Sequence, residues 1–315
     1  MPKSAGAHSR PSRVAVTRMS ELEQRIGEFL EELKRRSSSQ HTILAYGSDL
    51  RQFLAYFSPP GAEPPAPAAI GVWEIREWLA DLYARRLDPA SLRRKLASVR
   101  ALFRYLARHG WIEINRARLV LTPKAPQKLP AVMTQEQTNT LIDSVGSGRI
   151  ERPWPVRDRA IFEFLYGCGL RVSELVGMNL EDIEPAERWL RVRGKGRKER
   201  QVPYGAKAAE ALDRYLAERA APRETAVFLN VRRKRITARG VHGIVKLYAR
   251  LVSGDASIHP HSFRHAYATH LLSDGADLRA VQELLGHARL STTQKYTQLS
   301  LTDLMAVYDR AHPKA

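Results

Sequence analysis

The sequence predicts a mainly α-helical protein of two domains with one small β-hairpin. Its 315 residues are enough for two domains that each bury a core. Apolar residues recur every three or four positions over most of the chain, and only residues 189–192 and 199–202 form short strand-like runs. The expected divisions are a disordered basic arm at 1–18, a helical domain at 19–112, a linker at 113–130 and a second domain at 131–315.

The composition indicates an extended polyanion as partner. Lys and Arg number 51 against 33 Asp and Glu, which gives a formal charge of +18. Such an excess favours nucleic acid. No stretch approaches the roughly 18 consecutive apolar residues of a spanning helix, so a membrane is not the expected partner. Cys168 is the only cysteine, which excludes an intramolecular disulfide, and we expect a cytoplasmic protein.

The first domain is predicted to be a set of helices interrupted by one loop. Apolar spacing begins a helix at Met19 and a second after Ser39, whereas the proline-rich stretch Ser58–Ala69 predicts a loop. Helices resume at Trp73–Tyr83 and Ser91–Arg108. The polar face of this last helix carries Arg93, Arg94, Arg100 and Arg104. These arginines either contact DNA phosphates or form an ordinary solvated face, and the sequence supports both interpretations equally.

Local signals mark the elements of the second domain. Thr134 with Gln137 three residues later is a capping box, which predicts the start of a helix. The strand-like runs on either side of Gly194-Lys195-Gly196 predict a hairpin. The remaining pattern is mostly helical and ends in an amphipathic stretch, Leu301–Tyr308.

Several polar residues occur at spacings that place them on a shared helix face or at a helix end. His261 and Arg264 lie three residues apart in a helical pattern and therefore share one face. Glu174 follows Arg171 by one helical turn and can orient its guanidinium group. Gly286 is typical of a helix end, which leaves His287 at its edge. Taken singly, each of these residues is more often structural than catalytic.

Five ordered motifs give the chain a resemblance to the tyrosine recombinases, or phage integrase family, over nearly its whole length. The motifs are Gly169-Leu170-Arg171-Val172-Ser173-Glu174-Leu175, Gly194-Lys195-Gly196-Arg197-Lys198, His261 to His270, Leu284-Leu285-Gly286-His287 and Ser291-Thr292-Thr293-Gln294-Lys295-Tyr296. The resemblance implies that the catalytic residues are Arg171, Lys195, His261, Arg264, His287 and Tyr296, with Glu174 in support. It also implies a C-shaped clamp, in which a helical core-binding (SAM-like) domain and a catalytic domain close around duplex DNA.

The chemistry of a phosphodiester explains these residue types. In-line attack places charge on the nonbridging oxygens, which Arg171 and Arg264 are suited to offset, with His287 as a third donor. The phenol of Tyr296 has an ordinary pKa of about 10 and needs a proton acceptor, for which His261 is the candidate. The resemblance implies that Lys195 protonates the leaving 5′ hydroxyl. A 3′-phosphotyrosine preserves the energy of the broken bond, so we expect no need for ATP. Because the arginines supply the positive charge, we also expect no metal or other cofactor.

Further basic residues are candidates for DNA contact. Besides the four arginines above, these are Lys124, Lys128, Arg197, Lys198, Arg232 and Arg233. The run 193–200 is alternatively a solvated turn or a basic localisation cluster. His261 and His265 could alternatively bind a metal, with His270 or His259 as a further ligand.

Within the family, the chain looks most like the XerC branch. That likeness implies site-specific recombination that resolves chromosome dimers at cell division, together with a XerD-like partner recombinase and a DNA-translocase activator. It also implies a C-terminal helix that docks on a neighbouring protomer, although packing on its own domain is an equal alternative. Two other functions stay open, namely DNA relaxation as in type IB topoisomerases and DNA binding without catalysis.

Overall fold

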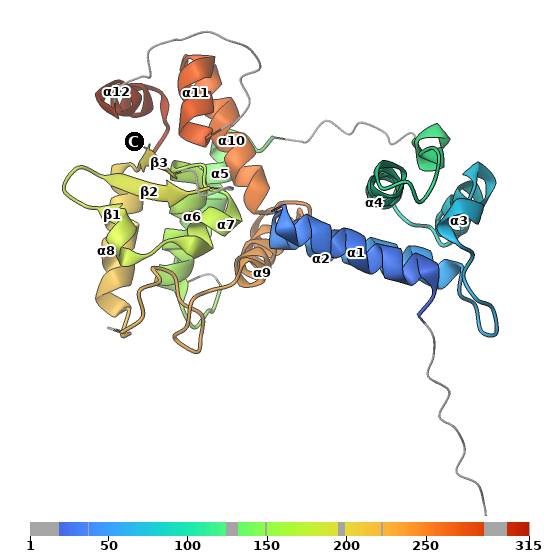
Figure 1. Cartoon of the computed structure of the whole chain (residues 1–315). Helices are drawn as coiled ribbons and strands as arrows, with labels where there is room; N and C mark the ends of the chain where they lie inside the picture. Colours follow the sequence, from blue (N-terminus) through green and yellow to red (C-terminus); the bar gives the residue numbers. More distant parts are fainter. Residues whose placement is uncertain are drawn as a thin grey trace, which may run out of the picture. The chain divides into compact units, whose positions relative to one another are not determined.

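The protein divides into two compact units, Met1–Lys128 and Leu129–Ala315. The computed structural model describes residues 19–36, 38–123, 132–148, 150–194, 199–221, 223–286 and 301–314. These residues are mainly helical with one three-stranded sheet, which confirms the predicted fold class (Figure 1). The predicted basic arm lies outside the described residues. Within the described ranges, no helix has the length and apolar character needed to cross a membrane.

The first unit is a helical bundle around one apolar core. Its described elements are α1 (Glu21–Arg35), α2 (Gln40–Tyr56), η1 (Pro67–Ala69), α3 (Val72–Ala84), α4 (Pro89–Arg108) and η2 (Arg116–Leu119). Side-chain oxygens of Ser20, Ser39 and Asp88 cap the first turns of α1, α2 and α4 by accepting backbone N–H groups. The core is centred on Phe53, whose ring meets Trp78 and Phe103 edge-on.

The first unit continues into the segment that we expected to be linker. Ala117 and Val120 are buried in its core. The Nε of Arg100 donates to the Ala117 carbonyl at 3.1 Å, and its Nη2 donates to the Val120 carbonyl at 2.5 Å. The segment has no sequence periodicity of its own, and these long-range bonds from α4 hold it to the unit. The remainder of the predicted linker, 124–130, lies outside the described residues.

The second unit is larger and combines helices with the sheet. Its described elements are α5 (Gln135–Ser144), α6 (Pro155–Gly167), α7 (Val172–Gly177), η3 (Leu180–Asp182), β1 (Ile183–Glu184), β2 (Trp189–Arg193), β3 (Glu199–Pro203), α8 (Ala206–Glu218), α9 (Ala238–Tyr248), η5 (Ala249–Ser253), α10 (Pro260–Ser273), α11 (Leu278–Leu285) and α12 (Leu301–Ala311). The predicted capping box opens α5, since Thr134 and Gln137 each accept the other's backbone N–H group. Helix α6 is buried on nearly all sides and forms the centre of the unit.

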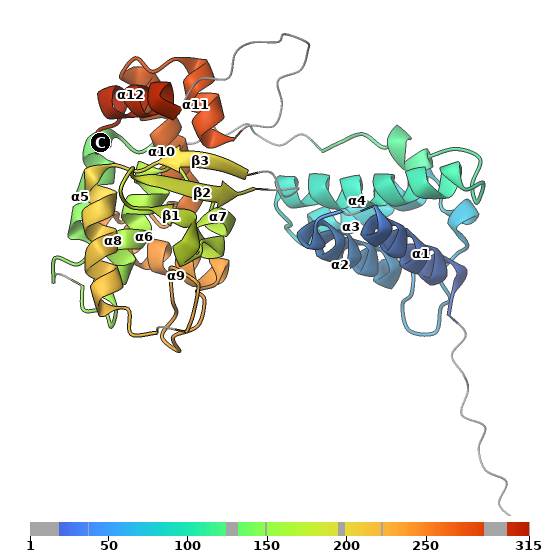
Figure 2. The same cartoon turned by 60° about the vertical axis from the view of Figure 1, so that its left-hand side comes forward.

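The predicted hairpin is confirmed. β2 and β3 are antiparallel, with Arg193 opposite Glu199 and Trp189 opposite Pro203. β1 adds a third strand of two residues, which is too short to give a sequence signal. Helices α11 and α12 lie on the β3 side of the sheet in both views (Figure 2).

The predicted C-terminal helix is present as α12 and packs on its own unit. Leu304, Tyr308 and Ala311 are buried in the core of this unit. Beyond the helix, the ring of His312 stacks on that of Tyr308 at 4.8 Å, and the Nζ of Lys314 lies 3.1 Å from Oε1 of buried Glu163. Exchange of α12 between protomers stays a prediction.

Candidate active site

The site begins at a turn between α6 and α7 that requires glycine. Gly169 has φ +55°, and a Cβ there would lie 2.5 Å from Cδ1 of Tyr267 on α10. A side chain at this position would therefore be strained and would also collide with the ring. The close approach lets the Gly169 carbonyl accept a hydrogen bond from Nη1 of Arg264 at 2.6 Å. The turn thus connects Arg264 to the segment that precedes Arg171.

Glu174 holds Arg171 at two points. One carboxylate oxygen accepts the backbone N–H of Arg171 at 2.8 Å, and the other accepts its Nη1 at 2.7 Å. The Glu174 side chain is only 2% exposed, whereas that of Arg171 is 42% exposed. The expected contact between the two is therefore present, and it leaves part of the Arg171 guanidinium open to solvent.

His261 and Arg264 occupy the first turns of α10. Pro260 is the first residue of this helix, and the Nδ1 of His259 caps it by accepting the Ser262 N–H. Arg264 is 4% exposed and donates through Nη2 to the carbonyl of Leu285, at the end of α11. Partial burial of the ring, followed by the charge of Arg264 and its neighbours, lowers the pKa of His261. Its imidazole is therefore neutral at neutral pH.

Arg264 keeps its charge although it is buried. Burial, followed by the charge of Arg171, lowers the pKa of Arg264 to about 10, while Glu174 acts in the opposite direction. The distance from Arg264 Nη1 to a Glu174 carboxylate oxygen is 3.8 Å. Arg264 is therefore a cation at neutral pH, and its field reaches both Arg171 and His261.

Sequence reasoning missed Arg200 on β3. Its guanidinium group donates to both carboxylate oxygens of Glu174, at 2.8 and 3.0 Å, and its Nε donates to the Leu284 carbonyl at 3.0 Å. The sequence predicts a hairpin tip or a solvated turn for the run 193–200 and gives Arg200 no separate role. The two-residue alternation of a strand could have identified Arg200, because it places Arg200 on the same face of β3 as buried Val202.

The end of α11 has the predicted glycine. Gly286 adopts a left-handed conformation with φ 64°, and its N–H bonds to the carbonyl of Glu283. The described structure therefore brings together Arg171, Glu174, His261 and Arg264. The remaining catalytic candidates, Lys195, His287 and Tyr296, lie outside the described residues, as do the DNA-contact candidates Lys124, Lys128, Arg197 and Lys198.

The alternative interpretation of His261 and His265 as metal ligands requires further ligands near them. No cluster of three or more His, Cys, Asp or Glu residues suited to a metal occurs in the described ranges. One of the proposed ligands, His270, uses both ring nitrogens elsewhere, with Tyr166 Oη and the Met133 carbonyl each at 2.9 Å. His270 is therefore a buried histidine with its hydrogen bonds satisfied.

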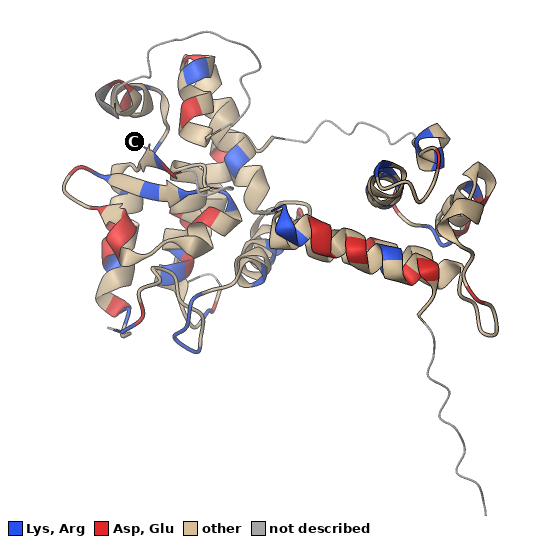
Figure 3. Cartoon of the chain, in the orientation of Figure 1, with Lys and Arg blue, Asp and Glu red and all other residues tan. Residues whose placement is uncertain are grey.

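The candidate DNA-contact residues of α4 differ in their surroundings. Arg93 and Arg104 are exposed, but Arg94 pairs with Asp49, and Arg100 is bonded to carbonyls of its own unit. Acidic residues instead recur along the ribbon of α1 (Figure 3). In the second unit, Arg232 and Arg233 lie on an exposed turn, where Nη1 of Arg233 donates to the Ala220 carbonyl at 3.0 Å.

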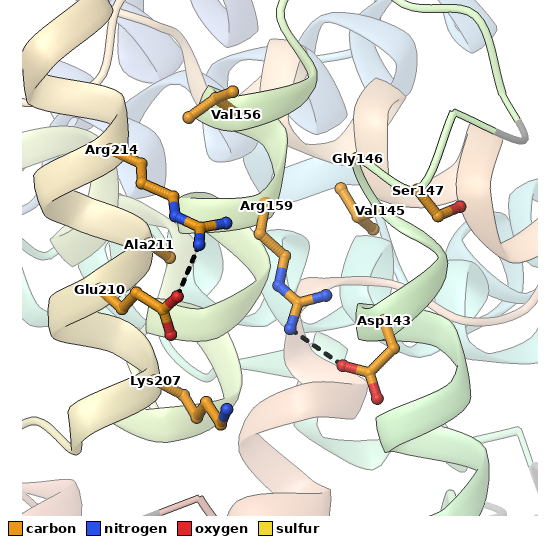
Figure 4. Close-up of a pocket in the computed structure, with 10 residues that line it drawn as sticks. All are labelled: Asp143, Val145, Gly146, Ser147, Val156, Arg159, Lys207, Glu210, Ala211 and Arg214. Carbon is orange, nitrogen blue, oxygen red and sulfur yellow. Dashed lines mark hydrogen bonds and ion pairs between the residues drawn. The ribbon is translucent and has the colours of Figure 1, made fainter.

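A cavity of about 310 Å³ lies between α5, α6 and α8 (Figure 4). Two of its arginines are paired, Arg159 with Asp143 at 2.9 Å and Arg214 with Glu210 at 2.8 Å. None of the catalytic candidates lines this cavity. It is therefore separate from the candidate active site.

Two protein-family models together match most of the chain. The model of the phage integrase family matches residues 131–302, and that of the phage integrase N-terminal SAM-like domain matches residues 26–110. Tyrosine recombinase XerC of Pelobacter propionicus is 46% identical over 89% of this chain and 92% of that protein. The XerC of Myxococcus xanthus is 40% identical over 95% of this chain and 100% of its own length.

Solved structures show the same fold. The XerH site-specific recombinase bound to its difH substrate has a TM-score of 0.68 at 21% identity, covering 92% of this chain and 96% of that one. A lambda integrase dimer bound to a core site has a TM-score of 0.66 at 19% identity, covering 88% and 98%. From its family matches and its curated relatives, this chain belongs to the phage integrase family and is a tyrosine recombinase.

Proposed function

We propose that Tyr296 is the nucleophile of a site-specific DNA recombination reaction, and that Arg171, Lys195, His261, Arg264 and His287 assist it. The observation that carries this proposal is the group formed by Arg171, Glu174, His261 and Arg264. Two arginine cations and one neutral imidazole lie there, at the N-cap of α7 and in the first turns of α10. The buried carboxylate of Glu174 bonds to Arg171 and lies 3.8 Å from Arg264.

The two arginines offset charge on the phosphate in different ways. Arg171 has an exposed guanidinium that matches the fork geometry of a phosphate oxygen pair. Arg264 is fixed by the carbonyls of Gly169 and Leu285, so it is already oriented before DNA binds. Such preorganised charge stabilises the transition state without rearrangement during the reaction, and His287 would supply a third donor.

The proton transfers follow from the protonation states. His261 is neutral and can accept the phenolic proton as Tyr296 attacks the phosphorus. Lys195 then gives a proton to the departing 5′ oxygen, which leaves a 3′-phosphotyrosine. The 5′ hydroxyl of another strand can attack this ester and reverse the step. Strand exchange therefore conserves the bond energy and requires no ATP.

We further propose that the reaction resolves chromosome dimers with a second, XerD-like recombinase on duplex DNA. The support is the XerC name of the relatives, which span nearly the whole chain. A DNA translocase as activator belongs to the same proposal. The basic residues on α4 and at Arg232 and Arg233 would provide a salt-dependent affinity for the duplex.

A nicked suicide duplex carrying the presumed dimer-resolution site tests the nucleophile. The partner recombinase is added, and a denaturing gel measures the covalent protein–DNA complex. Wild type and Tyr83→Phe, which changes an exposed tyrosine of the first unit, should both form the complex. Tyr296→Phe should bind the duplex equally well and form none. A covalent complex with Tyr296→Phe would overturn the assignment, and a wild type that binds this site but never cleaves it would favour the non-catalytic alternative.

A further inference from the structure

The guanidinium group of Arg200 lies at the junction of three segments that carry the proposed catalytic residues. It belongs to β3, which begins at Glu199, four positions after Lys195 in the sequence. Its two Nη atoms hold the carboxylate of Glu174, which in turn holds Arg171. Its Nε holds the Leu284 carbonyl, two residues before Gly286 and three before His287. The Arg200 side chain is 14% exposed, so these contacts occupy it.

The backbone at Gly286 is adapted to this arginine. A Cβ on Gly286 would lie 2.8 Å from Cδ of Arg200, and the residue also has φ 64°. Glycine is therefore needed both for the left-handed helix end and for the aliphatic part of Arg200. A lysine could preserve the charge at position 200, but it lacks the planar fork that reaches both oxygens of Glu174 and the Leu284 carbonyl together.

We infer that Arg200 is a positioning residue of the strand-cleavage reaction, which fixes β3, the Arg171–Glu174 pair and the end of α11 relative to one another. This inference rests on the proposed function of the site. Arg200 acts through Glu174 and the α11 carbonyl, and not by contact with the phosphate. Without Arg200 the catalytic side chains would still be present but no longer aligned. A displacement of about 1 Å costs about 100-fold in rate.

The first test separates cleavage from DNA binding. Arg200→Lys is compared with Arg191→Lys, because Arg191 lies on β2 of the same sheet and pairs with Asp182 instead of Glu174. Both changes keep the charge, so both proteins should bind the duplex within about twofold of wild type at equal salt. At saturating DNA, and well below the melting temperature of either variant, Arg200→Lys should form the covalent complex about 10- to 100-fold more slowly.

The second test is a pH profile, which a purely structural residue would not alter. Glu174 faces Arg171 from α7, Arg200 from β3 and Arg264 from α10. Burial alone would raise the pKa of Glu174, but the hydrogen bonds and charge of Arg200, followed by those of Arg171, lower it overall. Arg200→Gln removes the largest of the causes that lower the pKa of Glu174, so that pKa should rise. The acid limb of the cleavage profile should then move to higher pH, whereas that of Arg191→Gln should coincide with wild type, including the contribution of His261.

The outcomes distinguish this inference from the function on which it rests. If wild type forms no covalent complex, the proposed function fails. If wild type cleaves and Arg200→Lys keeps pace with Arg191→Lys, or if the profile of Arg200→Gln does not move, the role of Arg200 is refuted and the function stands. Gly286→Ala perturbs the same contact from the other side and should slow cleavage as well. It replaces Arg200→Lys if that variant does not fold.

Discussion

Asp49 in the first unit and Glu174 in the second are both buried carboxylates that contact several cations or donors. Asp49 accepts hydrogen bonds from Arg94, from Lys95 at 3.2 Å and from Ser98 at 2.9 Å, and all three donors lie on α4. It therefore joins one helix, α2, to one neighbour. The partners of Glu174 come from α7, β3 and α10, and one of them, Arg171, remains 42% exposed. A carboxylate of the first kind stabilises a fold, whereas one of the second kind aligns a site.

The largest effect on folding is expected from Asp49→Asn. The Lys95 side chain is only 5% exposed and would lose its counter-charge, which costs about 3–5 kcal/mol for a buried pair. Urea denaturation should show this loss in the first unit. The cleavage rate per folded molecule at saturating DNA should stay near that of wild type. A slower cleavage rate for Asp49→Asn, with the free energy of unfolding unchanged, would contradict the assignment of Asp49 to the fold.

Glu174→Gln should reduce the cleavage rate more than the stability, the reverse of Asp49→Asn. The amide keeps the size of the side chain, but it cannot accept the fork of Arg200 and the Nη1 of Arg171 with the same charge. Cleavage should slow by about 100-fold because the arginines lose their alignment. Single-turnover formation of the covalent complex measures the rate, and Glu181→Gln is the matched control, since Glu181 is an exposed residue on the nearby η3. Equal rates for the two variants would show that Glu174 serves the fold alone.

The two units should also differ in their response to acid. Burial lowers the pKa of His312, in the second unit, to about 3, so its folded form stays neutral where an unfolded histidine takes up a proton near pH 6.5. Stability that is present above pH 6.5 is therefore lost as pH falls, by about 1.4 kcal/mol per pH unit from this group. The described histidines of the first unit, His41 and His109, are exposed. Between pH 7 and pH 5, calorimetry should show a larger drop in the melting temperature of the second unit than in that of the first. His312→Phe should make the drop in the second unit smaller.

The sequence was sufficient to predict what depends on local pattern. Apolar spacing predicted the helices, the Thr134–Gln137 pair predicted the start of α5, and Gly286 predicted a helix end. The Arg171–Glu174 contact also follows from a spacing of three residues. These features need only neighbouring residues, so a single sequence contains them.

Other contacts of the site could not be predicted because they join residues far apart in the chain. Arg200 reaches Leu284 across 84 positions, and Arg264 reaches Gly169 across 95. The burial of Arg264 and the role of the Gly169 turn follow from this tertiary packing. The same reason explains Arg100, whose bonds to the carbonyls of Ala117 and Val120 gave structure to a segment that resembled a linker.

The smallest effect is expected on α4, where substitutions of two arginines on the same predicted DNA-contact face should have different effects. Arg104 is exposed, so Arg104→Gln should leave the melting temperature unchanged and reduce the salt slope of DNA binding by about one unit, as for one lost phosphate contact. Arg100→Gln removes donors from two carbonyls and should cost about 1–2 kcal/mol of stability. Binding titrations over a range of salt, alongside thermal melts, measure both. If Arg104→Gln left the slope intact, this face of α4 would be merely solvated. A shallower slope with unchanged melting would instead show that α4 uses its exposed arginines for DNA and its enclosed arginine for the fold.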